Sequence, residues 1–244
     1  MTHAAAATPV PYASRRRRPA PAAGERVGAA AGVLGAVALV VATAMLSATP
    51  SVDTTPAVVR LHLLDHSTVS MVSASTLAVG ALLLVPFLAS LRTFSARRSA
   101  GAAWRWTVTL VMGAVGISML ALAGAFLVTA TVLADRSTDD TVFAVFVSAK
   151  LLATLALVPV AALVLANARA IAPSQRRPDR WLVRFDIEIA VLAAVASVAT
   201  FVDRGWFAPG EPIVAVAWSL VALWVVALAA TIVRGDHTRP KEGS

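Results

Sequence analysis

A single apolar stretch in the middle of this chain limits the folds that are open to it. The stretch runs from Asp139 to Arg169, with acidic residues at its start, a basic residue at its end, and Lys150 as the charged residue between them. A helix of about 20 apolar residues crosses the hydrocarbon core of a bilayer, which is roughly 30 Å thick. The stretch is therefore predicted to be a helix that crosses a membrane.

Five more apolar runs and the overall composition extend this prediction to the whole chain. Of the 244 residues, 58% are hydrophobic and 14% are charged, whereas soluble domains are typically about 25% charged. We predict an all-α protein, a bundle of six transmembrane helices between an Arg-rich, disordered tail (residues 1–27) and a short tail (residues 234–244). The predicted spans are residues 28–48, 69–91, 107–134, 141–169, 185–202 and 213–233.

The distribution of charge predicts how the spans are oriented. Three of the 21 Lys and Arg residues fall in the three predicted outer loops, which also hold seven acidic residues, and 17 basic residues fall on the other side. Cytoplasmic loops of membrane proteins carry an excess of Lys and Arg. Both termini are therefore expected in the cytoplasm of a bacterial cell, and the membrane is expected to be the inner (plasma) membrane.

Local signals refine the elements. Gly28 and Gly32 form a GxxxG step that allows another helix to approach closely. Pro86 and Pro159 predict kinks, and Asp139 or Asp140 is expected to cap the fourth span. Residues 56–68 are amphipathic, and the sequence leaves open whether they extend the second span or lie on the membrane surface.

Lys150 is the first candidate for a functional group, because ionisable residues inside a membrane are costly and need compensation. Asp65, Asp139 and Glu188 are the candidate partners, and Asp186 shares the first turns of the fifth span with Glu188. The sequence allows three interpretations: a proton or ion relay, a static charge pair, or a Lys150 side chain that reaches outward to the interface.

A polar stripe beside the second span is the second candidate. His62, His66, Ser70 and Ser73 share one helical face if the helix is continuous, and Asp65 lies beside them. Two His at this spacing can bind Zn or Cu, and His can also sense pH. A solvated outer helix explains the same residues without any ligand.

Other chemistry is not indicated. The chain has no cysteine, and we find no nucleophile elbow, phosphate-binding loop or dinucleotide-binding motif. The net charge of +8 lies in loops between apolar spans, which points to membrane orientation and not to nucleic acid. We expect a protein that is not an enzyme and has no cofactor.

The layout resembles that of uncharacterised multi-pass integral membrane proteins of actinobacteria. The resemblance rests on the Arg-rich start, six Ala/Val-rich spans, the segment PDRWLVRFD before the fifth span and AWSLVALWVVALA in the sixth. It covers the whole chain and implies a membrane bundle, but no activity and no site residues.

Three functions fit these observations. The first is a structural or regulatory subunit that binds another membrane protein, a second copy of itself, or lipid. The second is a small proton- or ion-coupled transporter that uses Lys150. The third is a metal-binding membrane protein with its site on the outer face, at His62 and His66.

Overall fold

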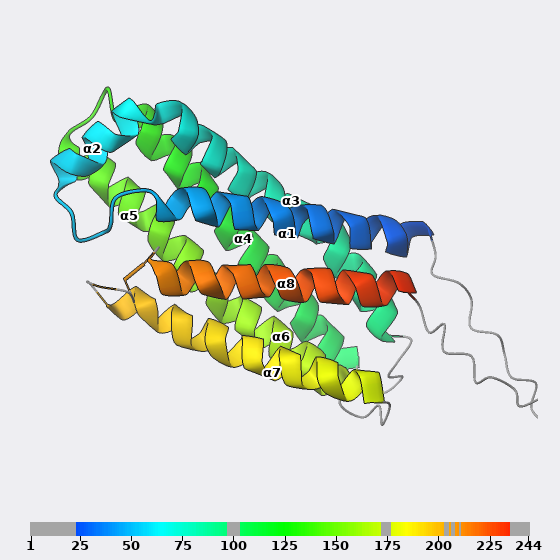
Figure 1. Ribbon diagram of the computed structural model, residues 1–244. Coiled ribbons are helices and arrows are strands. Elements are labelled where there is room, and N and C mark those ends of the chain that lie inside the picture. Colours follow the sequence, from blue (N-terminus) through cyan, green and yellow to red (C-terminus); the bar gives the residue numbers. More distant parts are fainter. Residues whose placement is uncertain are drawn as a thin grey trace, which may run out of the picture.

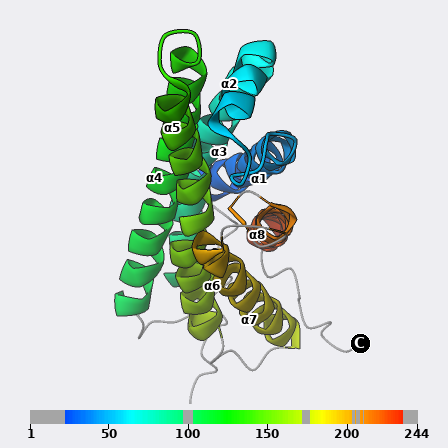
Figure 2. The same ribbon diagram turned by 90° about the vertical axis from the view of Figure 1, so that its left-hand side faces the viewer.

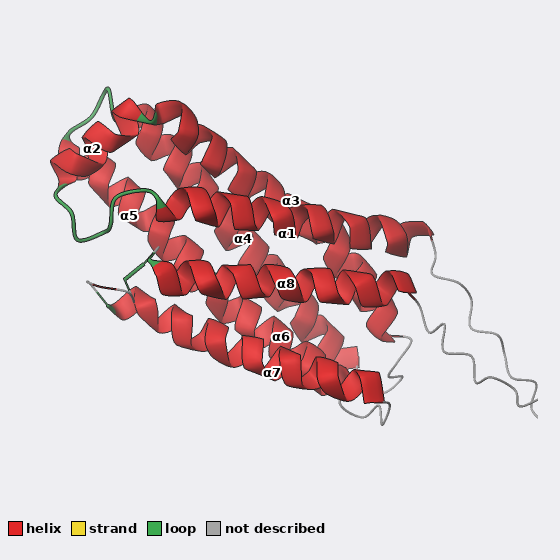
Figure 3. Ribbon diagram, viewed as in Figure 1, coloured by secondary structure: helices red, strands yellow, loops and turns green. Residues whose placement is uncertain are grey.

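The computed structural model describes residues 23–96, 103–171, 177–202, 205, 208–209 and 211–234. The predicted N-terminal tail before residue 23 and the C-terminal tail after residue 234 lie outside these residues. Every regular element in the described part is a helix (Figure 3). The helices are α1 (Ala23–Ser47), α2 (Pro56–Asp65), α3 (Ser67–Ala96), α4 (Ala103–Leu133), α5 (Asp139–Leu155), α6 (Leu157–Ile171), α7 (Arg177–Ser197) and α8 (Pro212–Arg234), with a short 3-10 helix, η1 (Val198–Phe201), after α7.

The long helices form a closed ring. Going around it, α1 packs on α3, α3 on α4, α4 on the pair α5 and α6, α6 on α7, α7 on α8, and α8 on α1. The start of α1 and the end of α8 lie at the same end of the bundle, here called the terminal end (Figure 1). The short helix α2 and the α4–α5 turn lie at the opposite end, here called the α2 end, and Figure 2 views the molecule from there.

Five of the predicted spans are long and apolar enough to cross a membrane. They are Ala23–Ser47, Ser67–Phe94, Trp106–Leu133, Asp139–Arg169 and Pro212–Arg234. The sixth, predicted at residues 185–202, is not confirmed by this criterion. Its helix α7 begins earlier, at Arg177, and includes four charged residues from Arg180 to Glu188.

The first span also begins earlier than predicted, at Ala23 instead of residue 28. Glu25 lies in the first turn of α1, where a negative charge is favourable because the amino end of a helix carries a partial positive charge. Residues 56–68 do not form a straight extension of the second span. The helix is interrupted at His66, whose φ of −117° and ψ of 30° end α2 before α3 begins at Ser67.

The kink predicted at Pro159 coincides with an interruption of the helix at Ala156. Helix α5 ends at Leu155 and α6 begins at Leu157. Proline lacks an N–H group and its ring clashes with the carbonyl four residues earlier, which here belongs to Leu155. The helix α3, in contrast, continues through Pro86 without interruption.

The closest helix contact involves the glycines of α1. A Cβ atom on Gly28 would lie 2.5 Å from the carbonyl oxygen of Pro86, and one on Gly32 would overlap the ring of Phe87. A Cβ on Gly35 would lie 2.9 Å from the carbonyl oxygen of Gly80. The GxxxG step of the sequence is therefore the face of α1 that lies against α3.

We expect Gly32→Ala to destabilise the bundle, because the added Cβ would overlap the buried ring of Phe87 and force one of the two helices or the ring to shift. Overpacking of this kind typically costs about 1–3 kcal/mol. The matched control is Gly24→Ala, since a Cβ there meets nothing within 4 Å. Thermal unfolding in detergent should show a lower midpoint for Gly32→Ala alone. Equal midpoints for the two variants would contradict the close α1–α3 contact.

Candidate functional site

Lys150 is buried in α5 and its charge is held by neutral groups. Its side chain is 4% exposed, and Nζ donates a hydrogen bond of 2.7 Å to the carbonyl oxygen of Pro50, in the segment between α1 and α2. The ammonium also lies 5.1 Å from the centre of the Phe146 ring, a distance at which a cation is attracted to the aromatic face. The contact ties α5 to the segment that follows α1.

The acids expected to pair with Lys150 do not do so. Within the described residues, Asp139 forms an ion pair with Arg60 instead, and Asp65 and Glu188 are exposed. The carboxylates whose charges act on Lys150 are those of Glu211 and Asp53. Of the three interpretations, an outward-reaching side chain fits the geometry, because Pro50 lies in the segment that leads to α2.

A small cavity lies beside Lys150. It has a volume of about 30 Å³ and is lined by Thr43 of α1, Trp218 of α8 and mostly apolar side chains. A buried water needs roughly 10–15 Å³ of such space and two to four polar partners. The cavity therefore has room for one or two waters next to the ammonium.

Asp186 forms a second buried polar centre, between α6, α7 and α8. Its side chain is fully buried. One carboxylate oxygen accepts a hydrogen bond of 2.7 Å from Nε1 of Trp224, and the other accepts one of 2.9 Å from Nδ2 of Asn167. Oδ1 of Asn167 is buried without a hydrogen-bond partner. The centre therefore ties three helices together and retains one unsatisfied acceptor.

Helix α8 connects the two centres. Nε1 of Trp218 donates a hydrogen bond of 3.2 Å to the carbonyl oxygen of Ala153, in the last turn of α5. A second cavity of about 40 Å³ is lined by Trp218, Trp224 and apolar residues of α3, α4, α6 and α8. This apolar cavity is thus shared by Trp218, which also lines the cavity beside Lys150, and by Trp224, which binds Asp186.

The predicted polar stripe is divided by the break at His66. Ser70 and Ser73 are buried within the bundle, whereas His66 is exposed. The rings of His62 and His66 stack with centres 4.6 Å apart. Among the described residues there is no group of three or more His, Cys, Asp or Glu that could hold a metal ion.

The surroundings of His62 change the pKa of its imidazole. Burial lowers the pKa of His62 below its ordinary value of 6.5, and the charge of His66 acts in the same direction, while Asp65 opposes it. Neutral His62 therefore contributes stability above pH 6.5, and this contribution is lost as the pH falls through the lowered pKa of the folded state.

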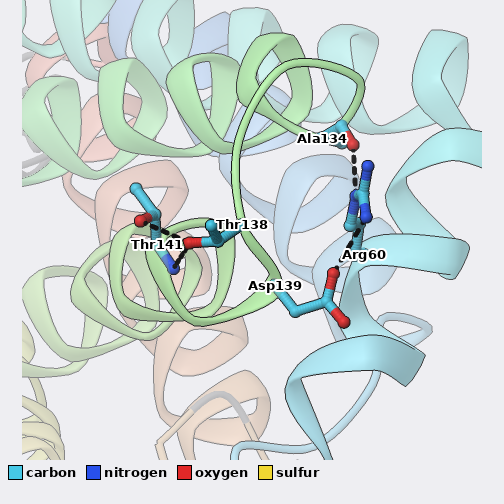
Figure 4. A network of polar contacts seen from close by, with 5 residues as sticks. All are labelled: Arg60, Ala134, Thr138, Asp139 and Thr141. Atoms are coloured by element: carbon cyan, nitrogen blue, oxygen red, sulfur yellow. Dashed lines mark hydrogen bonds and ion pairs between the residues drawn. The ribbon is translucent and has the colours of Figure 1, made fainter.

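Arg60 attaches α2 to the α4–α5 turn (Figure 4). Its Nε donates a hydrogen bond of 2.6 Å to the carbonyl oxygen of Ala134, and its Nη1 lies 3.0 Å from Oδ1 of Asp139. The expected cap of α5 is wrong: Thr138 is the N-cap, and its hydroxyl accepts a hydrogen bond from the backbone N–H of Thr141. Asp139, the first residue of the helix, is left to pair with Arg60.

Sequence reasoning missed four groups that complete these centres: Asn167, Trp224, Arg60 and the carbonyl of Pro50. An Asn near the end of an apolar span is a detectable signal, since such a residue can form hydrogen bonds across helices. A backbone carbonyl gives no signal in the sequence.

No protein-family model, curated protein or solved structure matches this chain. Function is therefore argued from the geometry of the chain itself. The two buried centres can hold helices together, and the orphan acceptor at Asn167 can bind a water or a proton donor.

We expect Asp186→Asn to retain the stability of the bundle. The side-chain oxygen of an Asn at this position still accepts a hydrogen bond from Trp224. Its NH₂ group can donate to Oδ1 of Asn167 once the Asn167 amide has flipped. Asp186→Ala instead leaves the buried donors of Trp224 and Asn167 unpaired, at a cost of about 1–3 kcal/mol each. Thermal unfolding of both variants in detergent checks this, and an Asn variant as unstable as the Ala variant would contradict it.

Replacing Arg60 by Met should release α2 from the α4–α5 turn, because both anchoring contacts come from the guanidinium. Hydrogen exchange read by mass spectrometry should increase across residues 56–65. Arg136→Met is the matched control, since Arg136 pairs with Asp135 at the exposed surface and such pairs contribute little. Unchanged exchange in the Arg60 variant would exclude this anchor.

Proposed function

We propose that this protein is a six-span plasma-membrane protein that is not an enzyme and acts as a structural or regulatory subunit. In this role it binds another component of the membrane, either a protein or a lipid. The proposal is supported by the sizes of the cavities inside the bundle and of the hollow on its side.

The sixth span in this proposal is α7. Its place in the ring supports the assignment, because α7 packs between α6 and α8 and lies alongside both of them (Figure 1). Six crossings put the start of α1 and the end of α8 on one side. The excess of basic residues at that end favours the cytoplasm.

One observation carries the proposal: in the described part of the bundle, the cavities inside the ring are small and a much larger hollow opens on its side. The charged groups inside are held by Pro50, Asn167 and Trp224, and the two internal cavities measure about 30 and 40 Å³. A hollow of about 980 Å³ opens between α3 and α4 on the outside of the ring. Solute-sized space is thus found on a lateral face, where another membrane component can reach it.

Affinity purification of the tagged chain from its native membrane in mild detergent tests the proposal. We expect a stoichiometric protein partner or tightly held lipid, detected by mass spectrometry. Reconstituted alone, the chain should move no protons or solutes faster than empty liposomes do. A lone, lipid-free chain with transport activity would overturn the proposal.

A proton- or ion-coupled carrier is the second candidate, and the unsatisfied Oδ1 of Asn167 favours it. A buried carboxylate beside an unpaired acceptor is a place where a proton can be held and released. This reading uses Asp186 together with Lys150, on either side of the apolar cavity between Trp218 and Trp224. Proton uptake into liposomes that is abolished by both Asp186→Asn and Lys150→Met would favour it.

A further inference from the structure

The hollow between α3 and α4 is an elongated groove with one polar end. Apolar side chains line most of it, including Leu88, Leu110 and Ile117. Arg92 and Thr93 line it where α3 approaches the terminal end of the bundle. Leu82 and Val85 also line the groove, and 61% and 51% of their surfaces are exposed. The groove therefore opens on the outer surface of the bundle.

The groove has the length of one leaflet. On α3 it extends from Leu82 to Arg92, which at 1.5 Å per residue is about 15 Å. The hydrocarbon core of a bilayer is roughly 30 Å thick, so 15 Å is half of it. Toward the α2 end the two helices close up, since a Cβ on Gly124 would lie 2.8 Å from the carbonyl oxygen of Ala74.

The sequence of the α3–α4 hairpin has an excess of positive charge. From residue 67 to residue 134, which covers α3, α4 and the segment between them, the sequence contains no acidic residue and four arginines: Arg92, Arg97, Arg98 and Arg105. All four fall between residues 92 and 105. Arg92 is exposed and makes no hydrogen bond or ion pair within the described part of the chain. The guanidinium is therefore free to bind an anion, and basic pockets at the cytoplasmic ends of membrane helices bind lipid headgroups.

From this geometry we infer that the groove holds an anionic phospholipid of the cytoplasmic leaflet, with an acyl chain between α3 and α4 and its phosphate at Arg92. The inference rests on the proposed function and names the membrane component that is bound. A helix of a partner protein fits less well, because a spanning helix needs the full 30 Å and is 10–12 Å wide. The groove is closed over half of that length.

Lipid retention by the purified full-length chain tests the inference. The chain is solubilised from vesicles of equal parts phosphatidylglycerol and phosphatidylcholine, and the lipid that remains bound is measured by mass spectrometry. We expect phosphatidylglycerol to be retained over phosphatidylcholine. Arg92→Gln should lower retained phosphatidylglycerol about fivefold, since one Arg near the surface contributes about 1 kcal/mol to binding an anionic headgroup. Ala114→Trp should lower it by filling the groove.

Each variant has a matched control outside the groove. Arg26→Gln removes an exposed charge from α1 at the same end, and Val111→Trp places a Trp at an exposed position of α4 that does not line the groove. Both should retain lipid as the unmodified chain does. Arg92→Gln alters an exposed side chain, so its result stands even if Ala114→Trp does not fold.

Three results would overturn the inference. Equal retention of the two lipids would exclude a charged headgroup, and full retention in both groove variants would exclude the groove. A dimer that forms a disulfide through Val85→Cys would show that a second copy occupies this face. Failure to find a protein partner in native membranes bears on the proposed function alone, because lipid retention is read on the isolated chain.

Discussion

Close backbone contact between α1 and α3 is the constraint on which the rest of the bundle depends. In hydrocarbon the hydrophobic effect does not drive helices together, so van der Waals contact at small residues must do so. Gly28 and Gly32 let α1 lie directly on the Pro86 carbonyl and the Phe87 ring of α3. With α1 fixed in this way, α8 packs against it and closes the ring that began at α3. The two internal cavities lie inside a ring whose closure requires this one contact.

The buried charges act as ties in places where packing alone is weak. Helix α7 is the most highly charged of the long helices, and Asp186 fixes it to Asn167 of α6 and Trp224 of α8 through two short hydrogen bonds. Lys150 does the same for α5, which it holds to the segment after α1. Neither charge neutralises the other. The direct contacts of each are with neutral groups, so two desolvated ions are not brought together across the apolar centre.

The sequence predicts the positions of the helices well because hydropathy and proline act locally. The positions of five spans and the interruption before Pro159 follow from residues that are near one another in the chain, although the ends of the helices do not: α1 begins five residues before the predicted start. Partners across helices depend on how each helix is rotated, and one residue corresponds to about 100° of rotation. Asp186 and Glu188 are two residues apart and therefore lie on nearly opposite faces. One is fully buried and the other is exposed, a difference that the apolar composition of the span does not encode.

The α3–α4 hairpin differs from the rest of the bundle in how its charges are balanced. Elsewhere in the described residues three charged groups have partners within the chain: Arg60 has Asp139, Asp186 has Trp224, and Lys150 has a backbone carbonyl. The hairpin has four arginines and no acid of its own, and Arg92 stands at the mouth of its groove. A membrane with anionic lipids supplies the missing charge from outside, at the depth where the groove ends. The proposed binding site, formed by Arg92 and the α3–α4 groove, therefore faces the lipid around the bundle.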